Sequence, residues 1–318
     1  MSVCKNMITR HIEGKFHYDL VSQQITDYYT FPCGKCTNCK IQIAKEWALR
    51  CCLELPYWDK SIFTTLTFND ENNLDPSIHK EEFSKFIKDV RNDLRKDGRK
   101  IKVLGCGEYG DESKRKHYHA IIFGIGLDEE TRQIGKSTTH LSENGILEEN
   151  WLKGNVFNGV VTYNSARYVA SYVFKKYYDD LENEMYTKLG LETPFQHTSG
   201  GIGKSYYEEY GKQTLQRGYI MLNGIKNTIP RYFLDLYEKD GYHDKLKTMQ
   251  RDHAVDKFEK WYKSYTKELS QKLCCQPDEF NYNVLADIDQ NFRTEYFRQQ
   301  TDEVNAKSNL ADARNKLF

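Results

Sequence analysis

Three side chains near the middle of the chain could bind one metal ion. His117 and His119 are separated by one residue in a segment, 117–123, whose alternation predicts a β-strand. A strand turns successive side chains to opposite faces, so both imidazoles project from the same face. Residues 101–108 predict a second strand that ends at Glu108, and a hairpin through residues 109–116 would bring this carboxylate beside the imidazoles. Two imidazoles and one carboxylate, with positions left for water and substrate, form a divalent metal site, although surface histidines on a half-exposed strand would give the same pattern.

A second group of reactive side chains falls on a helix that we predict over about 165–178. Tyr168 and Tyr172 are four residues apart, so they share one face of that helix. Lys175 lies about one turn beyond Tyr172, on much the same face. The chain contains 23 tyrosines, so either one taken alone is more simply interpreted as a packing residue.

A third group of chemically active residues is a cysteine knuckle near the N-terminus. Cys33, Cys36 and Cys39 follow C-x2-C-x2-C spacing, and thiolates three residues apart can converge on one tetrahedral ion such as Zn²⁺. The candidates for a fourth ligand are Cys4, Cys51, Cys52 or a histidine. A structural metal and reduced, partly buried cysteines are both consistent with this pattern.

The elements that must position these groups predict an α+β fold. Residues 60–68 form a β-branched strand, residues 78–96 carry the apolar stripe of a helix that Gly98 ends, and the two hairpin strands follow. The order strand–helix–strand–strand is typical of a ferredoxin-like sheet, with residues 63–68 and 117–123 side by side in its middle. Residues 126–159 have the composition of loops, and the segments 244–273 and 292–318 suggest amphipathic helices.

Composition limits the class of protein. Mean hydropathy is −0.77, and no run approaches the roughly 18 apolar residues of a membrane span. The first residues lack the apolar core of a secretory signal, so we expect the protein to stay where it is made and its nine cysteines to be reduced or metal-bound. Net charge is zero, yet basic residues cluster before both hairpin strands, which would suit a polyanion. These residues are Arg91, Arg95, Lys96, Arg99, Lys100, Lys102, Lys114, Arg115 and Lys116.

The order and spacing of these segments resemble the HUH endonuclease superfamily, and within it the gokushovirus-type replication initiators of microviruses. The resemblance covers about residues 30–235. It is carried by the knuckle at 33–39, Phe-Thr-Thr-Leu-Thr at 63–67, Gly-Glu-Tyr-Gly at 107–110, His-Tyr-His at 117–119, the helix segment 168–175, and residues 200–204 and 229–232. It implies an HUH (ferredoxin/RRM-like) core with a central antiparallel sheet flanked by helices, followed by a helical C-terminal extension. We therefore divide the chain into an N-terminal segment with the knuckle (1–58), the endonuclease core (59–180) and a mainly helical region (181–318).

The resemblance also implies an activity: metal-dependent nicking of one DNA strand at a replication origin, followed by strand transfer or rejoining. A tyrosine, Tyr168 or Tyr172, would attack a phosphodiester, form a 5′-phosphotyrosine link and free a 3′-OH for rolling-circle replication. Glu108, His117 and His119 would hold Mg²⁺ or Mn²⁺. Lys175 would stabilise developing negative charge. Because a lysine follows Tyr172 by three residues whereas a serine follows Tyr168, we favour Tyr172 if only one of them acts.

The expected partners are single-stranded and supercoiled double-stranded phage origin DNA, together with a host helicase and polymerase, in the cytoplasm of a bacterial host and without a membrane. Three alternatives remain open at this point. The first is a plasmid rolling-circle initiator or a transposase with the same chemistry. The second is a non-catalytic nucleic-acid-binding protein, and the third is a metal-dependent hydrolase in which the tyrosines are incidental.

Overall fold

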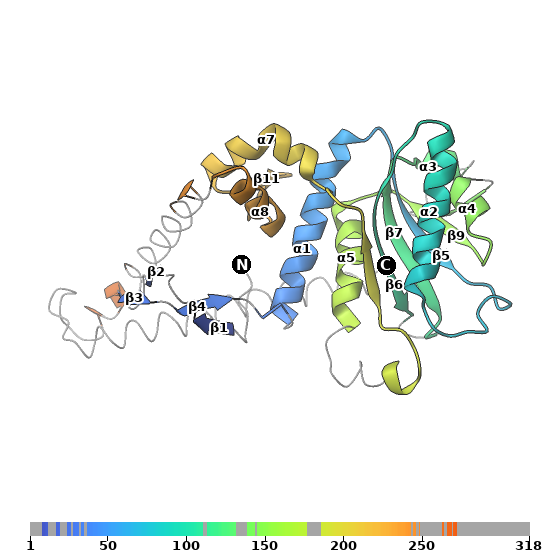
Figure 1. Ribbon diagram of the computed structural model, residues 1–318, viewed down its shortest axis with the longest axis horizontal. Helices are drawn as coiled ribbons and strands as arrows, with labels where there is room; N and C mark the ends of the chain where they lie inside the picture. The colour runs from blue at the N-terminus through green and yellow to red at the C-terminus, as the bar shows by residue number, and fades with distance from the viewer. Residues whose placement is uncertain are drawn as a thin grey trace. The chain divides into compact units, whose positions relative to one another are not determined.

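The computed structural model describes the central part of the chain most fully (Figure 1). The described residues are 8–11, 17–19, 24–26, 28–31, 33–34, 37–110, 113–131, 139–143, 145–176, 186–242, 244–245, 248, 263, 266–268 and 270–271. They fall into two compact units, of which the larger spans residues 43–233 and the other combines 1–42 with 234–318. No described helix combines the length and the apolar character that crossing a membrane requires.

The larger unit is built on a six-stranded antiparallel sheet with the order β10-β6-β7-β5-β9-β8. Its strands are β5 (Ser61–Thr67), β6 (Lys102–Tyr109), β7 (Lys116–Phe123), β8 (Thr139–Leu141), β9 (Val156–Gly159) and β10 (Phe195–Thr198). β5 and β7 pair in the middle of the sheet, as the sequence predicts. The α+β class, with an antiparallel sheet flanked by helices, is therefore confirmed.

Helices cover both faces of this sheet (Figure 1). The described helices are α1 (Thr37–Glu54), the 3-10 turn η1 (Leu55–Tyr57), α2 (Lys80–Lys96), α3 (Leu127–Glu130), α4 (Ile146–Asn150), α5 (Tyr163–Lys176), α7 (Lys204–Arg217) and α8 (Arg231–Lys239). α2 buries the apolar stripe expected of it, with Phe83 and Ile87 fully buried. Acidic residues in its first turn and basic ones in its last complement the helix dipole.

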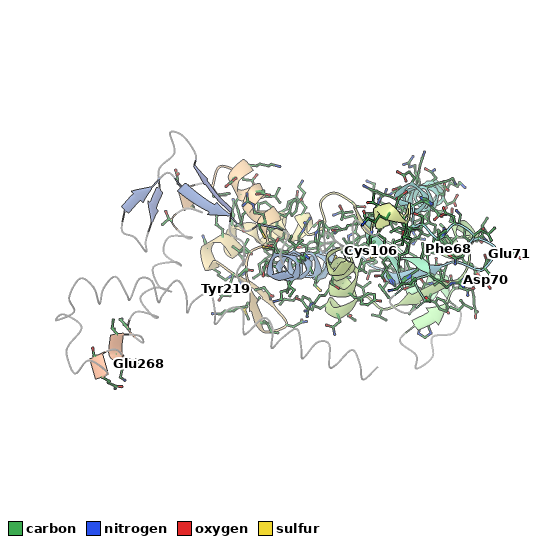
Figure 2. The ribbon with its side chains drawn as sticks, turned by 90° about the horizontal axis from the view of Figure 1, so that it is seen from below. Phe68, Asp70, Glu71, Cys106, Tyr219 and Glu268 are labelled. Atoms are coloured by element: carbon green, nitrogen blue, oxygen red, sulfur yellow. The ribbon has the colours of Figure 1, made fainter. Side chains whose placement is uncertain are left out.

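Each face of the sheet has its own hydrophobic core. On the α2 side, α2 packs with Ile62, Leu66, Phe68 and Tyr118. On the other side, Ala48 and Cys51 of α1 and Ala166 and Val169 of α5 pack on a second set of strand residues, which are Leu104, Cys106, Ile121 and Phe123. Figure 2 labels one residue of each core, Phe68 and Cys106. Burial of both faces fixes the strand register, because a slip of one residue would exchange the two sets of side chains.

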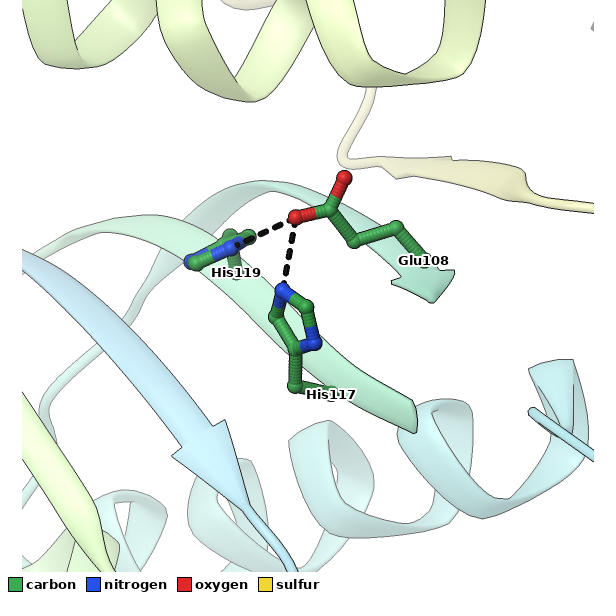
Figure 3. A group of neighbouring side chains, drawn as sticks. All are labelled: Glu108, His117 and His119. Carbon is green, nitrogen blue, oxygen red and sulfur yellow. Dashed lines mark hydrogen bonds and ion pairs between the residues drawn. The ribbon is translucent and has the colours of Figure 1, made fainter. Parts of the chain in front are cut away.

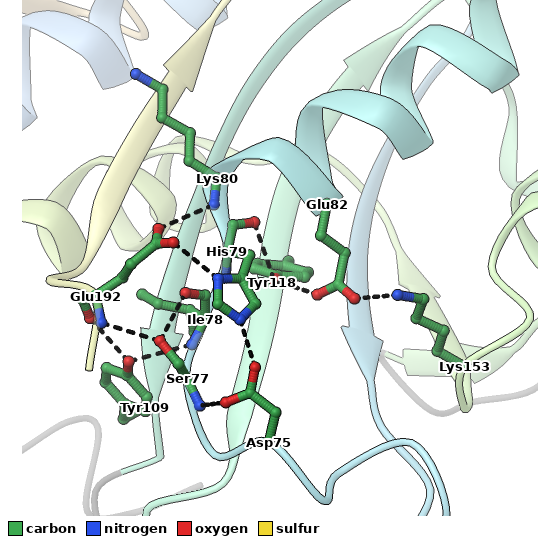
Figure 4. Close-up of polar contacts among 10 residues, drawn as sticks. All are labelled: Asp75, Ser77, Ile78, His79, Lys80, Glu82, Tyr109, Tyr118, Lys153 and Glu192. Atoms are coloured by element: carbon green, nitrogen blue, oxygen red, sulfur yellow. Dashed lines mark hydrogen bonds and ion pairs between the residues drawn. The ribbon is translucent and has the colours of Figure 1, made fainter. Parts of the chain in front are cut away.

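A polar network joins the N-terminal end of α2 to the sheet (Figure 4). The Tyr118 hydroxyl donates to Glu82 Oε2 at 2.6 Å and accepts the backbone N–H of His79 at 3.0 Å. The His79 imidazole lies between Asp75, at 2.5 Å, and Glu192, at 2.7 Å. These hydrogen bonds satisfy a phenol inside the core and a helix end that has no side-chain cap of its own.

The glycine-rich turn before α7 is held by the larger unit's own side chains. The buried carboxylate of Glu54 accepts the N–H of Gly203 at 2.6 Å and pairs with Lys102 Nζ at 2.6 Å. Lys102 also donates to the carbonyl of Gly201 at 2.9 Å. Although residues 198–205 resemble a phosphate loop in composition, the Gly203 N–H that could bind a phosphate is already occupied by a carboxylate.

The structure differs from the sequence-based expectation in several short elements. Residues 126–159, expected to be loops, contain α3, β8, α4 and β9, and the region beyond 181 contributes the edge strand β10 and the hairpin β11 (Ile220–Leu222) and β12 (Ile225–Asn227). Elements of three to five residues are too short to establish a periodic pattern. The predicted helix over 292–318 and most of that over 244–273 lie outside the described residues, and the three-part division of the chain stays a prediction.

In the smaller unit, four short strands form two antiparallel pairs. β1 (Ile8–His11) pairs with β4 (Tyr28–Phe31), and β2 (His17–Asp19) pairs with β3 (Gln24–Thr26). The described part of the cysteine knuckle follows β4 in the sequence.

Candidate active site

The hairpin of β6 and β7 creates the metal-ligand group through its register. Glu108 stands opposite His117, and Cys106 stands opposite His119. Because side chains alternate along each strand, Glu108, His117 and His119 project from the same face, the one that α5 covers. The sequence-based prediction that the hairpin would bring the carboxylate to the two histidines is confirmed.

The three side chains converge on one point (Figure 3). Glu108 Oε1 lies 2.7 Å from His117 Nε2 and 3.0 Å from His119 Nε2. One ligand atom from each residue can be chosen so that all lie within 4.8 Å of one another. Adjacent ligands of an octahedral ion with bonds of about 2.1 Å are about 3 Å apart, so the spacing suits a divalent cation.

The outer nitrogens of both imidazoles have partners that orient the rings. His117 Nδ1 lies 3.1 Å from the carbonyl oxygen of Arg115, and His119 Nδ1 lies 2.8 Å from Thr65 Oγ1. A carbonyl oxygen can only accept, so His117 Nδ1 carries a proton and donates it. That tautomer leaves a lone pair on Nε2, the nitrogen that faces Glu108, which is the arrangement that a metal-binding histidine needs.

The charge states of the ligands also suit a cation. Burial alone would raise the pKa of Glu108, but hydrogen bonds from His117 and His119 outweigh it, so this pKa lies below its ordinary value. Burial lowers the pKa of His119, against the opposing effect of Glu108. The site therefore offers an ionised carboxylate and a neutral imidazole at neutral pH.

One oxygen of Glu108 gives an independent test of whether a metal would fit. Oε2 is buried and has no hydrogen-bond partner among the described residues, and in Figure 3 it points away from both histidines. A buried carboxylate oxygen without a partner is costly. A cation bound beside Glu108 would remove that cost, so the residues present fit a divalent ion.

Helix α5 places a tyrosine directly over the metal-ligand group. The ring of Tyr168 meets that of His119 edge to face, with centroids 5.2 Å apart and planes at 78°. Phe63 of β5 stacks on the other side of this arrangement, 5.8 Å from His119 and 6.3 Å from Tyr168. Tyr168 is 38% exposed, so its ring is positioned by packing while part of it remains open to solvent.

The other predicted site residues of α5 are placed less completely. Tyr172 and Lys175 lie on the helix, but their side chains are outside the described residues. Ser171, the residue three positions after Tyr168, donates its hydroxyl to the carbonyl of Tyr168 at 2.9 Å. That hydroxyl is bonded to the helix backbone, so no lysine-like helper follows Tyr168.

Two threonines of β5 face this site and have different partners. Thr65 stands opposite His119 and is bonded to its imidazole, whereas Thr67 stands opposite His117 but donates to the carbonyl of Asn155 at 3.1 Å. Sequence reasoning missed the Thr65 contact and the Phe63 stack. The signal was present, because Phe63, Thr65 and Thr67 alternate along one strand face.

The cysteine knuckle is described in part. Cys33 Sγ and Cys39 Sγ lie 4.0 Å apart, and the side chain of Cys36 is outside the described residues. Burial raises the pKa of the Cys51 thiol, and raises the pKa of Cys52 to about 11, which disfavours the thiolate form that a metal ligand needs. A Zn²⁺ ion at Cys33, Cys36 and Cys39 stays a prediction.

The basic residues around the hairpin do not form one open patch. Arg99 pairs with Glu129 at 2.6 Å, and Arg115 pairs with Asp70 at 2.7 Å. The amine of Lys116 lies over the ring of Phe68, 4.3 Å from its centroid. Lys96 and Lys102 are also paired, with Asp93 and Glu54. The expectation of a polyanion site beside the metal ligands is corrected, because carboxylates from distant segments neutralise most of these cations.

Comparisons with known proteins give a consistent result. Residues 61–177 match the family described as Replication-associated protein ORF2. The chain is 34% identical over 234 residues to replication-associated protein VP4 of Bdellovibrio phage phiMH2K, covering 69% of this chain and 71% of that protein. It is 31% identical to replication-associated protein ORF2 of Spiroplasma virus 4, over 68% and 70% of the two chains. It is 30% identical to replication-associated protein ORF4 of Chlamydia phage 1, over 66% and 54%. No solved structure matches the chain.

Proposed function

We propose, from the premise that this chain belongs to the family of phage replication-associated proteins, that it initiates replication by cutting one strand of its phage's origin DNA. The cut would pass through a covalent 5′-phosphotyrosine intermediate and free a 3′-OH from which a host polymerase extends. Rejoining by the reverse reaction would complete each round. The observation that carries the proposal is the contact between the Tyr168 ring and the ring of His119, within the metal-ligand group.

The chemistry assigns each residue a role. A tyrosine oxygen forms a bond to phosphorus while the bond from phosphorus to the 3′ oxygen breaks. The phenol gives up its proton and the 3′ oxygen takes one up, so the number of phosphate esters is unchanged and no external energy source is needed for rejoining. The helix fixes the direction of attack because Tyr168 is packed between His119 and Phe63.

Glu108, His117 and His119 would hold Mg²⁺ or Mn²⁺. When bound, such an ion supplies charge stabilisation at the non-bridging oxygens of the scissile phosphate. One carboxylate with two imidazoles suits either ion, and the imidazoles favour Mn²⁺ of the two. The protein's contribution is an ionised Glu108 and two rings whose Nε2 atoms are turned inward by Arg115 and Thr65.

Two tyrosines four residues apart would allow two successive cuts at one metal site. While one phenol carries the 5′ end of the displaced strand, the other can attack the regenerated origin. Lys175, three residues beyond Tyr172, would stabilise its phenolate, whereas Ser171 is bonded to the helix backbone and leaves Tyr168 without this help. We therefore expect Tyr172 to be the faster nucleophile, with Tyr168 able to act in its turn.

The test is a covalent-adduct assay. The protein is incubated with Mn²⁺ and a single-stranded oligonucleotide carrying the phage's origin and labelled on the 3′ side of the cut, and the products are separated on a denaturing gel. We expect label that migrates with the protein. Tyr168→Phe and Tyr172→Phe should each leave partial cutting, and the double variant should form no adduct. Thr67→Val serves as a folded control whose hydroxyl bonds away from the site.

Two results would contradict the proposal. An adduct formed by the double tyrosine variant would show that another residue is the nucleophile. Metal-dependent cutting without any adduct would indicate a hydrolase that uses water. His119→Ala should abolish cutting while most DNA affinity remains, and cutting at the wild-type rate by that variant would refute the ligand role.

A further inference from the structure

A strip of unneutralised hydrogen-bond donors lies between α2 and the edge strand β10, on the face of the sheet opposite the metal ligands. Arg91 and Ser84 of α2 face His197 of β10 and Ser199, the residue that follows the strand. Lys80 lies one turn before Ser84 on the same side of the helix. The strip is thus separate from the residues that would cut DNA.

Ser199 has spare donor capacity. Its hydroxyl oxygen accepts the backbone N–H of Val103 at 2.9 Å and the guanidinium of Arg91 at 2.8 Å. A hydroxyl has one proton and two lone pairs, so both acceptor positions are used and the proton remains to be donated. No described residue accepts it. The position therefore calls for an acceptor from outside the chain.

Arg91 has the same deficit. Its guanidinium has five N–H donors, and its hydrogen-bond partner among the described residues is a neutral hydroxyl. Burial lowers the pKa of Arg91, so the charge is partly desolvated without a carboxylate beside it. A half-buried guanidinium without an acidic partner is a favourable place for an anion that can accept two parallel hydrogen bonds.

His197 and Lys80 extend this strip. The imidazole of His197 packs edge to face on Phe83, 5.4 Å away, and its Nδ1 lies 3.4 Å from Ser84 Oγ. Burial lowers the pKa of His197, and Arg91 and Lys80 lower it further, so the charges that act on it are both positive. The carboxylate nearest in sequence, Glu192, is bonded to His79 and to the backbone N–H of Lys80. Figure 4 shows the Lys80 side chain extending away from that group.

The geometry points to a second phosphate-binding site, formed by Arg91, Ser199, His197 and Lys80, that takes a phosphodiester of the DNA chain. The ligand's identity as DNA rests on the proposed function. The anion-binding chemistry rests on the donors alone. β10 is the last strand on its side of the sheet, so a nucleic acid chain could pass around this edge from one face to the other. The strip would then hold DNA by its backbone, with no preference for base sequence.

The test measures DNA affinity as a function of salt, in EDTA so that cutting plays no part. Fluorescence anisotropy of a labelled single-stranded origin oligonucleotide gives the slope of log K against log salt. Loss of one phosphate contact should reduce the slope by about 0.7 and weaken binding about 5-fold at low salt. We expect this for Arg91→Gln and for Lys80→Gln. Lys80→Gln leaves the helix backbone bonds intact, so it reports even if Arg91→Gln unfolds.

Lys85→Gln is the matched control. It removes one positive charge from the same helix, but Lys85 is exposed and paired with Asp89 at 2.6 Å. Its slope should equal that of the wild type. A second arm adds inorganic phosphate at constant ionic strength and follows the melting temperature. Stabilisation by phosphate that Arg91→Gln abolishes, with an unchanged DNA slope, would identify a free-phosphate site and overturn the assignment to DNA.

The remaining outcomes separate this inference from the proposed function. If the wild type cuts DNA but folded Arg91→Gln and Lys80→Gln keep its salt slope, this inference is wrong and the proposed function stands. A lower melting temperature with an unchanged slope would make Arg91 a structural clamp on Ser199. If the wild type binds no DNA at any salt concentration, both fail.

Discussion

Thr65 is the residue through which the metal site can be tested without touching a ligand. Its hydroxyl lies 2.8 Å from His119 Nδ1, and the His119 side chain is only 6% exposed. In Thr65→Val the side chain keeps its shape but loses the hydroxyl. A metal on Nε2 requires the proton on Nδ1, and in the variant that buried N–H has no acceptor.

The cost falls mainly on the metal-bound state. Without metal, the imidazole can move its proton to Nε2 and donate to Glu108, so only a lone pair is left without a partner. With metal bound, an unsatisfied buried donor costs about 1–3 kcal/mol. Since about 1.4 kcal/mol is a factor of ten, we expect metal affinity to fall about 10- to 100-fold, the range typical of losing such a supporting contact.

The assay is a titration with Mn²⁺ followed by electron paramagnetic resonance, with the melting temperature measured in EDTA. Thr65→Ser should retain most of the affinity because it keeps the hydroxyl. Thr67→Val is the matched control, since Thr67 occupies the equivalent position opposite His117 but bonds to Asn155. The reasoning is refuted if folded Thr65→Val binds Mn²⁺ as tightly as the wild type, or if Thr67→Val loses as much affinity.

Two further predictions concern stability. Hydrogen bonds from Asp75 and then Glu192 raise the pKa of His79, so its charged form stabilises the fold below its ordinary pKa of 6.5 and this contribution is lost as pH rises through the raised value. The melting temperature of the wild type minus that of His79→Gln should therefore be largest near about pH 6 and shrink above about pH 8; a difference that grows with pH would contradict this. Lys102→Met should lower the free energy of unfolding, measured in urea, by about 3 kcal/mol, because it leaves the fully buried Glu54 carboxylate without its cation. The double variant with Glu54→Gln should lose less, and equal losses would argue against the ion pair.

The metal-ligand group could be predicted from the sequence because its geometry is local. A strand alternates its side chains, and a hairpin brings its two strands together, so His117, His119 and Glu108 had few ways to be arranged. The family membership that the motifs suggested is confirmed by the comparisons. The paired position of Tyr168 and Tyr172 on one helix follows from helical spacing alone.

Other features depend on contacts that no local pattern encodes. The carbonyl of Arg115 orients His117, but a backbone group leaves no trace in the residue types. The basic residues looked like an open patch because their acidic partners are far away in the sequence; Lys102 and Glu54 are separated by 48 positions. β10 was missed for a related reason, since its four residues become a strand only through pairing with β6.

The placement of the reactive groups along the chain has a consequence for how such an enzyme can change. Glu108 and His119 are 11 positions apart on one hairpin, whereas the tyrosines arrive on a separate helix, α5, that packs onto the finished sheet. The cation-binding half and the attacking half are thus separate modules. Substitutions on α5 can replace, double or delete the nucleophile while the hairpin keeps its ion, which makes this scaffold open to new strand-transfer or hydrolytic activities by changes in a single helix.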